Sequence, residues 1–179
     1  TAYVKGPLGG MGTTPSYPIG ASFNVITENQ PLIIDYGVGL GGYISDMTRT
    51  FVIGKLPREL ERAHDVSREI KYFMEEWVKP GKACAELYEE ILRIVQKRRL
   101  TNHFMGFGDC RVPFVGHGIG LELDEYPVIA ANKEAFKKGM VFAFEPKFAF
   151  PDKGAVGIED DYAVTDSGVE RLTNYDDNI

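Results

Sequence analysis

Four carboxylates lie in the middle of apolar, strand-like segments of this chain. Asp35 follows Leu-Ile-Ile and Asp46 follows Tyr-Ile-Ser, whereas Glu145 follows Phe-Ala-Phe and Glu159 follows Gly-Ile. A lone acid in such a segment is most simply solvated or placed at a strand end, but four acids in two matching contexts make that explanation weak. Buried carboxylates that lie side by side repel each other unless a proton or a cation lies between them. These four positions therefore indicate a cation site.

A histidine between two glycines adds a nitrogen ligand to this set. His117 lies in the string Gly-His-Gly, where neighbouring backbone can approach closely. Carboxylates with one imidazole suit divalent Mn, Co, Fe or Zn rather than an all-thiolate structural zinc site. Four carboxylates are too many for one catalytic ion and fit two ions bridged by shared carboxylates. The residue types alone therefore favour a metal centre of hard ligands.

The first two acids flank a glycine-rich turn. Apolar residues 31–38 precede Gly39–Gly42, and residues 43–53 alternate between apolar and polar, which predicts a β-hairpin. If Asp35 lies directly opposite Asp46, the midpoint of the turn falls between Leu40 and Gly41. Directly opposite residues point to the same face with Cβ atoms about 5 Å apart. We therefore expect the two aspartates to form a cross-strand pair.

The other two acids are arranged in the same way. Residues 140–150 and 156–165 read as strands around the turn 151–154, and the midpoint between Glu145 and Glu159 is Asp152. The same device in two hairpins suggests an internal pseudo-repeat whose halves face each other.

Two helices are expected between the hairpins. Apolar residues recur at intervals of three and four from Pro57 to Trp77, before Pro80-Gly81, and again over Ala83–Leu100. Hairpin, helices, strand and hairpin together give an α+β fold, and we expect residues 1–179 to form one domain without an internal linker.

Composition narrows the class of protein. The 179 residues include 26 acidic and 20 basic side chains, for a formal charge of −6. There is no basic cluster on an aromatic-rich strand, so nucleic acid is not expected as a partner. No apolar run approaches the roughly 20 residues of a membrane span, and no signal peptide is recognisable, so a cytoplasmic protein that avoids membranes is expected. The chain starts at Thr1 with a Gly/Pro-rich segment, which suggests a C-terminal piece of a longer protein.

Five motifs, in order along the chain, resemble those of the Xaa-Pro peptidase branch of the methionine aminopeptidase/prolidase/creatinase superfamily. They are Asp35-Tyr-Gly, Gly42-Tyr-Ile-Ser-Asp46-Met-Thr-Arg-Thr-Phe51, Gly116-His-Gly-Ile-Gly-Leu-Glu122, Phe144-Glu-Pro146 and Gly157-Ile-Glu-Asp160. The resemblance implies the "pita-bread" fold, in which two pseudo-symmetric αβ halves enclose a dinuclear metal site, and often a homodimer. It implies as metal ligands Asp35, Asp46, His117, Glu145 and Glu159. It further implies that Asp46 and Glu159 bridge the ions and that Glu145 helps to activate the attacking water. The ions would be Mn or Co first, with Zn or Fe as alternatives.

The chain departs from this family on the substrate side. Asp124 stands where the family usually has the histidine of a His-Glu-x-Pro motif, and an ionised carboxylate accepts hydrogen bonds but cannot donate one. Pro113 replaces a second common histidine, and Gly157 replaces an arginine that often precedes the last Ile-Glu. Asp124 is therefore a candidate catalytic or specificity residue.

Two further side chains are weaker candidates for contact with a substrate. Tyr17 offers a hydroxyl and His103 could stand in for a lost histidine, although packing roles explain both more simply.

Two functions remain open. The first is a metal-dependent hydrolase of peptide bonds in short peptides, similar to Xaa-Pro dipeptidases and aminopeptidases. The second is a homologue that keeps the metal but is catalytically altered or inactive, or that hydrolyses a non-peptide amide or amidine.

Overall fold

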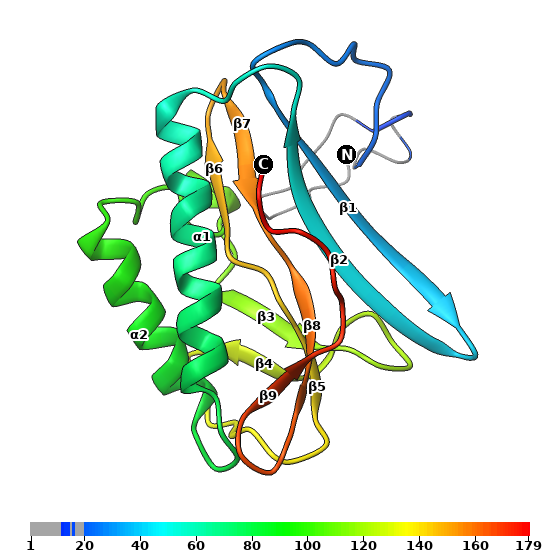
Figure 1. Cartoon of the computed structure of the whole chain (residues 1–179), viewed down its shortest axis with the longest axis vertical. Coiled ribbons are helices and arrows are strands. Elements are labelled where there is room, and N and C mark those ends of the chain that lie inside the picture. Colours follow the sequence, from blue (N-terminus) through cyan, green and yellow to red (C-terminus); the bar gives the residue numbers. More distant parts are fainter. Residues whose placement is uncertain (1–11, 15, 17–19) are drawn as a thin grey trace.

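The computed structural model describes residues 12–14, 16 and 20–179 (Figure 1). Tyr17 lies outside the described residues. The first hairpin consists of β1 (Pro31–Leu40) and β2 (Tyr43–Val52), and the helices α1 (Arg58–Trp77) and α2 (Cys84–Lys97) follow. A short 3-10 helix, Gly108–Cys110, precedes the remaining strands, which are β3 (Phe114–Gly118), β4 (Glu125–Ala130), β5 (Val141–Phe144), β6 (Lys147–Phe150), β7 (Gly154–Gly157), β8 (Asp160–Val164) and β9 (Val169–Arg171).

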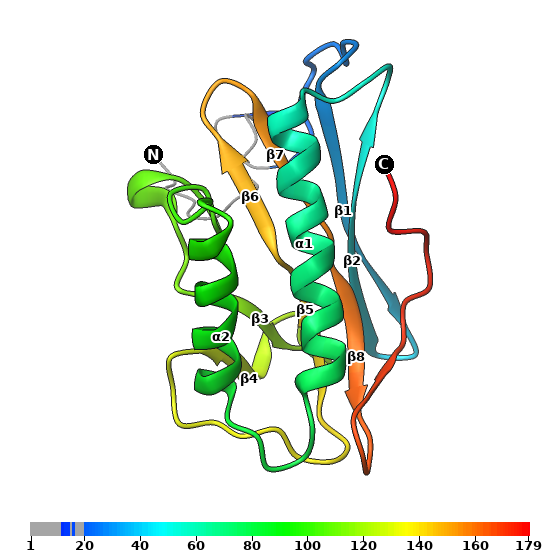
Figure 2. The same ribbon diagram turned by 60° about the vertical axis from the view of Figure 1, so that its left-hand side comes forward.

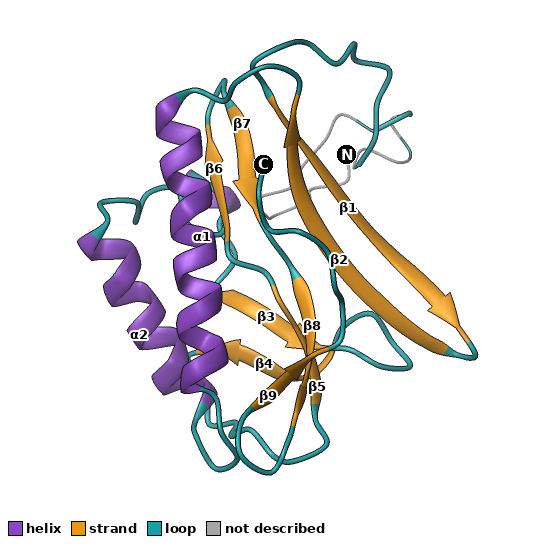
Figure 3. Ribbon diagram, in the orientation of Figure 1, coloured by secondary structure: helices purple, strands orange, loops and turns teal. Residues whose placement is uncertain are grey.

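The described strands form three antiparallel sheets. A five-stranded sheet has the order β4-β3-β5-β8-β9, and the pairs β1-β2 and β6-β7 form two-stranded sheets. Figure 3 shows α1 and α2 at the left and the β1-β2 hairpin at the right, with β6 and β7 between them, and Figure 2 shows the same arrangement turned by 60°. This α+β arrangement confirms the fold class expected from the sequence.

The two helices form where the apolar period of three and four predicts them. In α1 the buried face includes Leu60, Ile70 and Met74, and in α2 it includes Leu87 and Ile91. These residues share one hydrophobic core with sheet residues that include Phe142, Phe144, Phe148 and Tyr162. The second helix ends at Lys97, three residues earlier than expected. None of the helices in the described part of the chain is long and apolar enough to cross a membrane.

The register of the first hairpin differs from the prediction. Asp35 lies opposite Thr48 and Asp46 lies opposite Gly37, so the predicted direct pairing of the two aspartates is wrong. The turn consists of Gly41 and Gly42, whose φ angles of 60° and 91° are those a tight two-residue turn requires. Because side chains alternate along a strand, Asp35 and Asp46 still share one face, as diagonal neighbours.

The second hairpin is long and interrupted. Each expected strand is split, because pairing stops at Glu145-Pro146 on one arm and at Ile158-Glu159 on the other. Phe144 pairs with Asp160 before the interruption and Lys147 pairs with Gly157 after it. The same register, continued across the gap, sets Glu145 opposite Glu159, as expected. Both glutamates therefore lie where the ladder opens.

Candidate metal centre

The two hairpins meet at the predicted acids. An isolated antiparallel bridge joins Thr48 to Glu159, with Glu159 N donating to Thr48 O at 3.0 Å and Thr48 N to Glu159 O at 3.3 Å. Thr48 follows Asp46 by two residues, so both side chains lie on the same face of β2. This bridge brings the acids of the first hairpin to those of the second.

Three of the predicted ligands form a compact buried group. Ligand atoms of Asp46, His117 and Glu159 all lie within 4.8 Å of one another. Their residues are at most 8% exposed. Two carboxylates and an imidazole at this spacing fit one divalent cation of the Mn, Co, Fe or Zn type.

Glycines on both sides of His117 allow this approach. A Cβ atom at Gly116 would lie 2.4 Å from Ala143 O, and one at Gly118 would lie 2.2 Å from Tyr126 O. Neither position has room for a side chain, so β3 can lie between β4 and β5 only with glycine there. The close approach expected from the Gly-His-Gly string is confirmed.

The imidazole of His117 is oriented for metal binding through Nε2. Its Nδ1 lies 3.1 Å from the carbonyl oxygen of Gly118, which suits an Nδ1–H donor and leaves the Nε2 lone pair free. Nε2 faces Oε1 of Glu145 at 3.8 Å and Oε1 of Glu159 at 3.9 Å. These separations are too long for hydrogen bonds and leave space for an ion.

A lysine that the sequence interpretation missed lies among the same acids. The Nζ atom of Lys147 is 2.6 Å from Glu159 Oε2, 2.9 Å from Glu145 Oε2 and 3.1 Å from Asp35 Oδ2. Lys147 is only 2% exposed. The alternation of the strand was the available signal, because residue 147 shares a face with residue 145.

Crowding of acids changes their proton affinity. Burial, and after it the charge of Asp35, raises the pKa of Asp46 to about 6. Burial also raises the pKa of Glu159 well above its usual range, an effect that Glu145 and Asp46 reinforce and Lys147 opposes. Burial alone would lower the pKa of Lys147, but Glu145, Glu159 and Asp35 hold it well above its ordinary value, so the side chain is an ammonium ion. The cluster is therefore short of positive charge.

A further acid, Asp161, accepts a hydrogen bond from the backbone of Asp46. The backbone N–H of Asp46 donates to Asp161 Oδ2 at 3.0 Å. Burial raises the pKa of Asp161 to about 6, and its Oδ1 atom is buried without a hydrogen-bond partner among the described residues. An orphaned buried carboxylate oxygen beside the ligands is a second sign that the centre fits a cation.

An ion-pair network holds β2 against β8. Arg49 Nη1 donates to the carbonyl oxygens of Thr48 and Glu159, both at 2.8 Å, and its Nη2 donates to Asp160 Oδ1 at 2.7 Å. Lys71 on α1 contacts the other oxygen of Asp160 at 3.2 Å. This buried network fixes the bridge between the hairpins from the side opposite the cluster.

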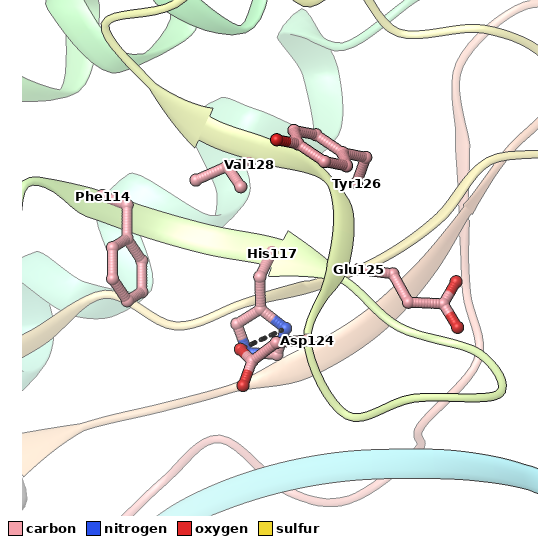
Figure 4. Close-up of a pocket in the computed structure, with 6 residues that line it drawn as sticks. All are labelled: Phe114, His117, Asp124, Glu125, Tyr126 and Val128. Carbon is pink, nitrogen blue, oxygen red and sulfur yellow. Dashed lines mark ion pairs between the residues drawn. The ribbon is translucent and has the colours of Figure 1, made fainter.

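A cavity of about 290 Å³ opens beside His117 (Figure 4). Its lining is mostly apolar, with Phe114, Tyr126 and Val128, and Asp124 is its nearest acid to the imidazole. Asp124 Oδ1 lies 3.6 Å from His117 Nδ1, and the Asp124 side chain is 76% exposed. The structure thus places Asp124 at the exposed edge of this cavity, beside His117.

His103 is not brought to this cavity. Its ring stacks on Phe150 with centroids 4.1 Å apart, and its Nδ1 lies 2.9 Å from Ala149 O at the far end of β6. The structure gives this side chain a packing role.

The chain is similar to known peptidases throughout this region. The profile of "Metallopeptidase family M24" matches residues 7–166. A Xaa-Pro dipeptidase of Pyrococcus furiosus is 35% identical over 154 residues, which cover 86% of this chain and 42% of that protein. A Xaa-Pro dipeptidase of Lactobacillus helveticus is 30% identical over 162 residues, covering 90% and 42%.

Solved structures agree with the sequence matches. The prolidase of Pyrococcus horikoshii superposes with a TM-score of 0.81 at 29% identity, over 96% of this chain and 47% of that one. The X-Pro aminopeptidase of Thermotoga maritima gives 0.81 at 25% identity, over 92% and 45%. The chain thus spans less than half the length of these relatives, and it shares their pita-bread fold. On its sequence and its fold, the chain belongs to metallopeptidase family M24.

Proposed function

We propose that the protein is a metal-dependent hydrolase of peptide bonds in short peptides, with Xaa-Pro dipeptides as its first candidate substrates. The observation that carries this proposal is the buried group Asp46, His117 and Glu159 beside an open cavity, in a chain of this family. A divalent ion, with Mn or Co expected first and Zn or Fe as alternatives, would polarise the scissile carbonyl and make a water molecule more acidic.

Glu145 is the proposed proton carrier. Its Oε1 atom faces His117 Nε2 at 3.8 Å, so it borders the position that the ligands surround. A carboxylate there can take a proton from the attacking water and return it to the leaving amine. Lys147 holds the other oxygen of Glu145 at 2.9 Å, which fixes the orientation of the carboxylate.

Asp124 and the apolar wall are proposed to select the substrate. Phe114, Tyr126 and Val128 offer an apolar surface that suits a proline ring or an aliphatic side chain. Asp124 is an exposed anion at the cavity mouth and is suited to pair with the free amine of a short peptide.

Cytoplasmic location and a homodimer belong to the same proposal.

The altered homologue remains the second candidate. Two features favour it: an ionised Asp124 cannot donate a hydrogen bond to a developing oxyanion, and the ammonium group of Lys147 lies within the carboxylate cluster. In this case the metal and the fold would be kept, but the substrate would be another amide or amidine, or turnover would be absent.

A dipeptide panel separates these candidates. The protein, loaded with Mn²⁺ or Co²⁺, is expected to release proline from Xaa-Pro dipeptides and to lose this activity in EDTA or with Glu145→Gln. Cys110→Ser serves as a control outside the centre. Absence of turnover with metal bound, and its appearance in Asp124→His, would shift the assignment to the altered homologue. Absence of any bound metal would exclude both.

A further inference from the structure

We propose that Lys147 takes the place of a second metal ion, so that the centre binds a single divalent cation. This inference rests on the metal site of the proposed function and concerns its composition. Dinuclear centres of the kind that the family resemblance implies need ligands for a second ion, which would come from Asp35 and from the bridging carboxylates Asp46 and Glu159. In this chain an ammonium group already contacts Asp35 and Glu159, and it contacts Glu145 as well.

Glu145 and Glu159 each direct one carboxylate oxygen towards His117 and the other towards Lys147. Oε1 of Glu145 and Oε1 of Glu159 face His117 Nε2, at 3.8 and 3.9 Å. Their Oε2 atoms contact Lys147 Nζ instead, at 2.9 and 2.6 Å. One side of the cluster is therefore built for an ion with an imidazole ligand, and the other side is built around the ammonium group.

Glu159 has no free acceptor on the lysine side. Its Oε2 accepts from Lys147 Nζ at 2.6 Å and also from the Thr48 hydroxyl at 2.6 Å. A carboxylate oxygen has two lone-pair sites, and both are used here. Glu159 can therefore serve an ion through Oε1 but cannot bridge to a second ion through Oε2 while both bonds stand.

The opposite strand is shaped to hold the lysine stem. Lys147 pairs with Gly157, and a Cβ atom at Gly157 would lie 2.6 Å from Lys147 Cγ and 2.8 Å from Lys147 Cα. Any side chain at position 157 would thus collide with the stem. Lysine at 147 and glycine at 157 fit together as a pair.

The Lys147 side chain is enclosed, so its ammonium group cannot turn to solvent without a change in the surrounding structure. Lys147 is 2% exposed, and its backbone is paired on both sides: Met105 N donates to Lys147 O at 3.0 Å, and β7 pairs along the other edge. A second dication on Asp35 and the Oε2 atoms would lie against the ammonium charge. Two positive charges in contact in a buried site repel each other strongly, so the ammonium group disfavours a second dication there.

Metal stoichiometry tests this proposal directly. The protein is equilibrated with excess Mn²⁺, freed of loose metal by gel filtration, and measured by elemental analysis and by EPR. Wild type is expected to hold about one Mn²⁺ per chain with the spectrum of an isolated ion, whereas Lys147→Ala is expected to hold about two with a spin-coupled spectrum. Lys147→Ser is a second variant if the alanine form does not fold. Lys153→Met, an exposed lysine of the same hairpin that pairs with Glu59, is the matched control and should behave as wild type.

The outcomes are distinct. Two coupled ions in wild type, or a single ion in folded Lys147→Ala and Lys147→Ser alike, would overturn the proposal. One ion in wild type without peptide hydrolysis would leave it standing and count against the peptidase activity alone. No bound ion in wild type would remove the metal site and both proposals with it.

Discussion

Removal of the Lys147 charge should destabilise the protein in a way that depends on metal. In Lys147→Met the stem is retained but Glu145, Glu159 and Asp35 lose the cation that contacts them at 2.6–3.1 Å. Removing one partner of a buried ion pair costs about 3–5 kcal/mol, because the remaining charge is left uncompensated. For a chain of this size each kcal/mol changes Tm by about 2–4 °C, so a fall of about 6–20 °C is expected in EDTA.

Saturating Mn²⁺ should reduce this difference between wild type and variant, because a bound dication neutralises the same carboxylates. Thermal unfolding followed by circular dichroism, in EDTA and in Mn²⁺, measures both values, with Lys153→Met as the control that should stay within about 0.5 kcal/mol of wild type. A Tm of Lys147→Met equal to that of wild type in EDTA would show that Lys147 does not offset the charge of the three acids. An equal loss with and without metal would show that a bound ion does not neutralise them.

Three other predictions concern separate parts of the structure. Gly157→Ala should lower the free energy of unfolding by about 1–3 kcal/mol in urea titrations, because the new methyl group meets the Lys147 stem and backbone; an unchanged midpoint would count against the tight fit. Burial lowers the pKa of His64 from 6.5 to about 4, so the folded state binds a proton there less readily than the unfolded state, and stability is lost as pH falls from 6.5 towards 4. Between pH 7 and pH 5 the free energy of unfolding of wild type should therefore fall by about 2 kcal/mol more than that of His64→Gln. Equal losses in the two proteins would contradict this. Asp124→His should raise kcat on Xaa-Pro dipeptides by about tenfold or more, since it supplies a hydrogen-bond donor at the cavity mouth. An unchanged or lower kcat would show that a donor at position 124 does not stabilise the reacting carbonyl.

The acids themselves were predictable from the sequence because each interrupts an apolar strand. Alternation along the strands correctly placed Asp35 and Asp46 on one face, although the register was set by a turn one residue later than expected, at Gly41-Gly42. The helices followed from their apolar period. The pairing of Glu145 with Glu159 agrees with the register on both sides of the interruption.

Alternation sets Lys147 on the same face as Glu145, but it does not show that the lysine is buried. A lysine near the end of an apolar strand usually extends to solvent, and only the close approach of Gly157 and the bridge at Thr48 show that this one is enclosed. The location of His103 was equally inaccessible, because a loop histidine gives no periodic signal of the surface on which it packs.

The most direct test of the central claim is anomalous diffraction from crystals of the Mn²⁺-loaded protein. One strong manganese peak is expected, coordinated by Asp46, by His117 through Nε2 and by Glu159, with the Lys147 ammonium group still in contact with Glu159 Oε2. Two manganese peaks in the cluster, a peak away from these three residues, or no peak under saturating metal would contradict the single-ion centre.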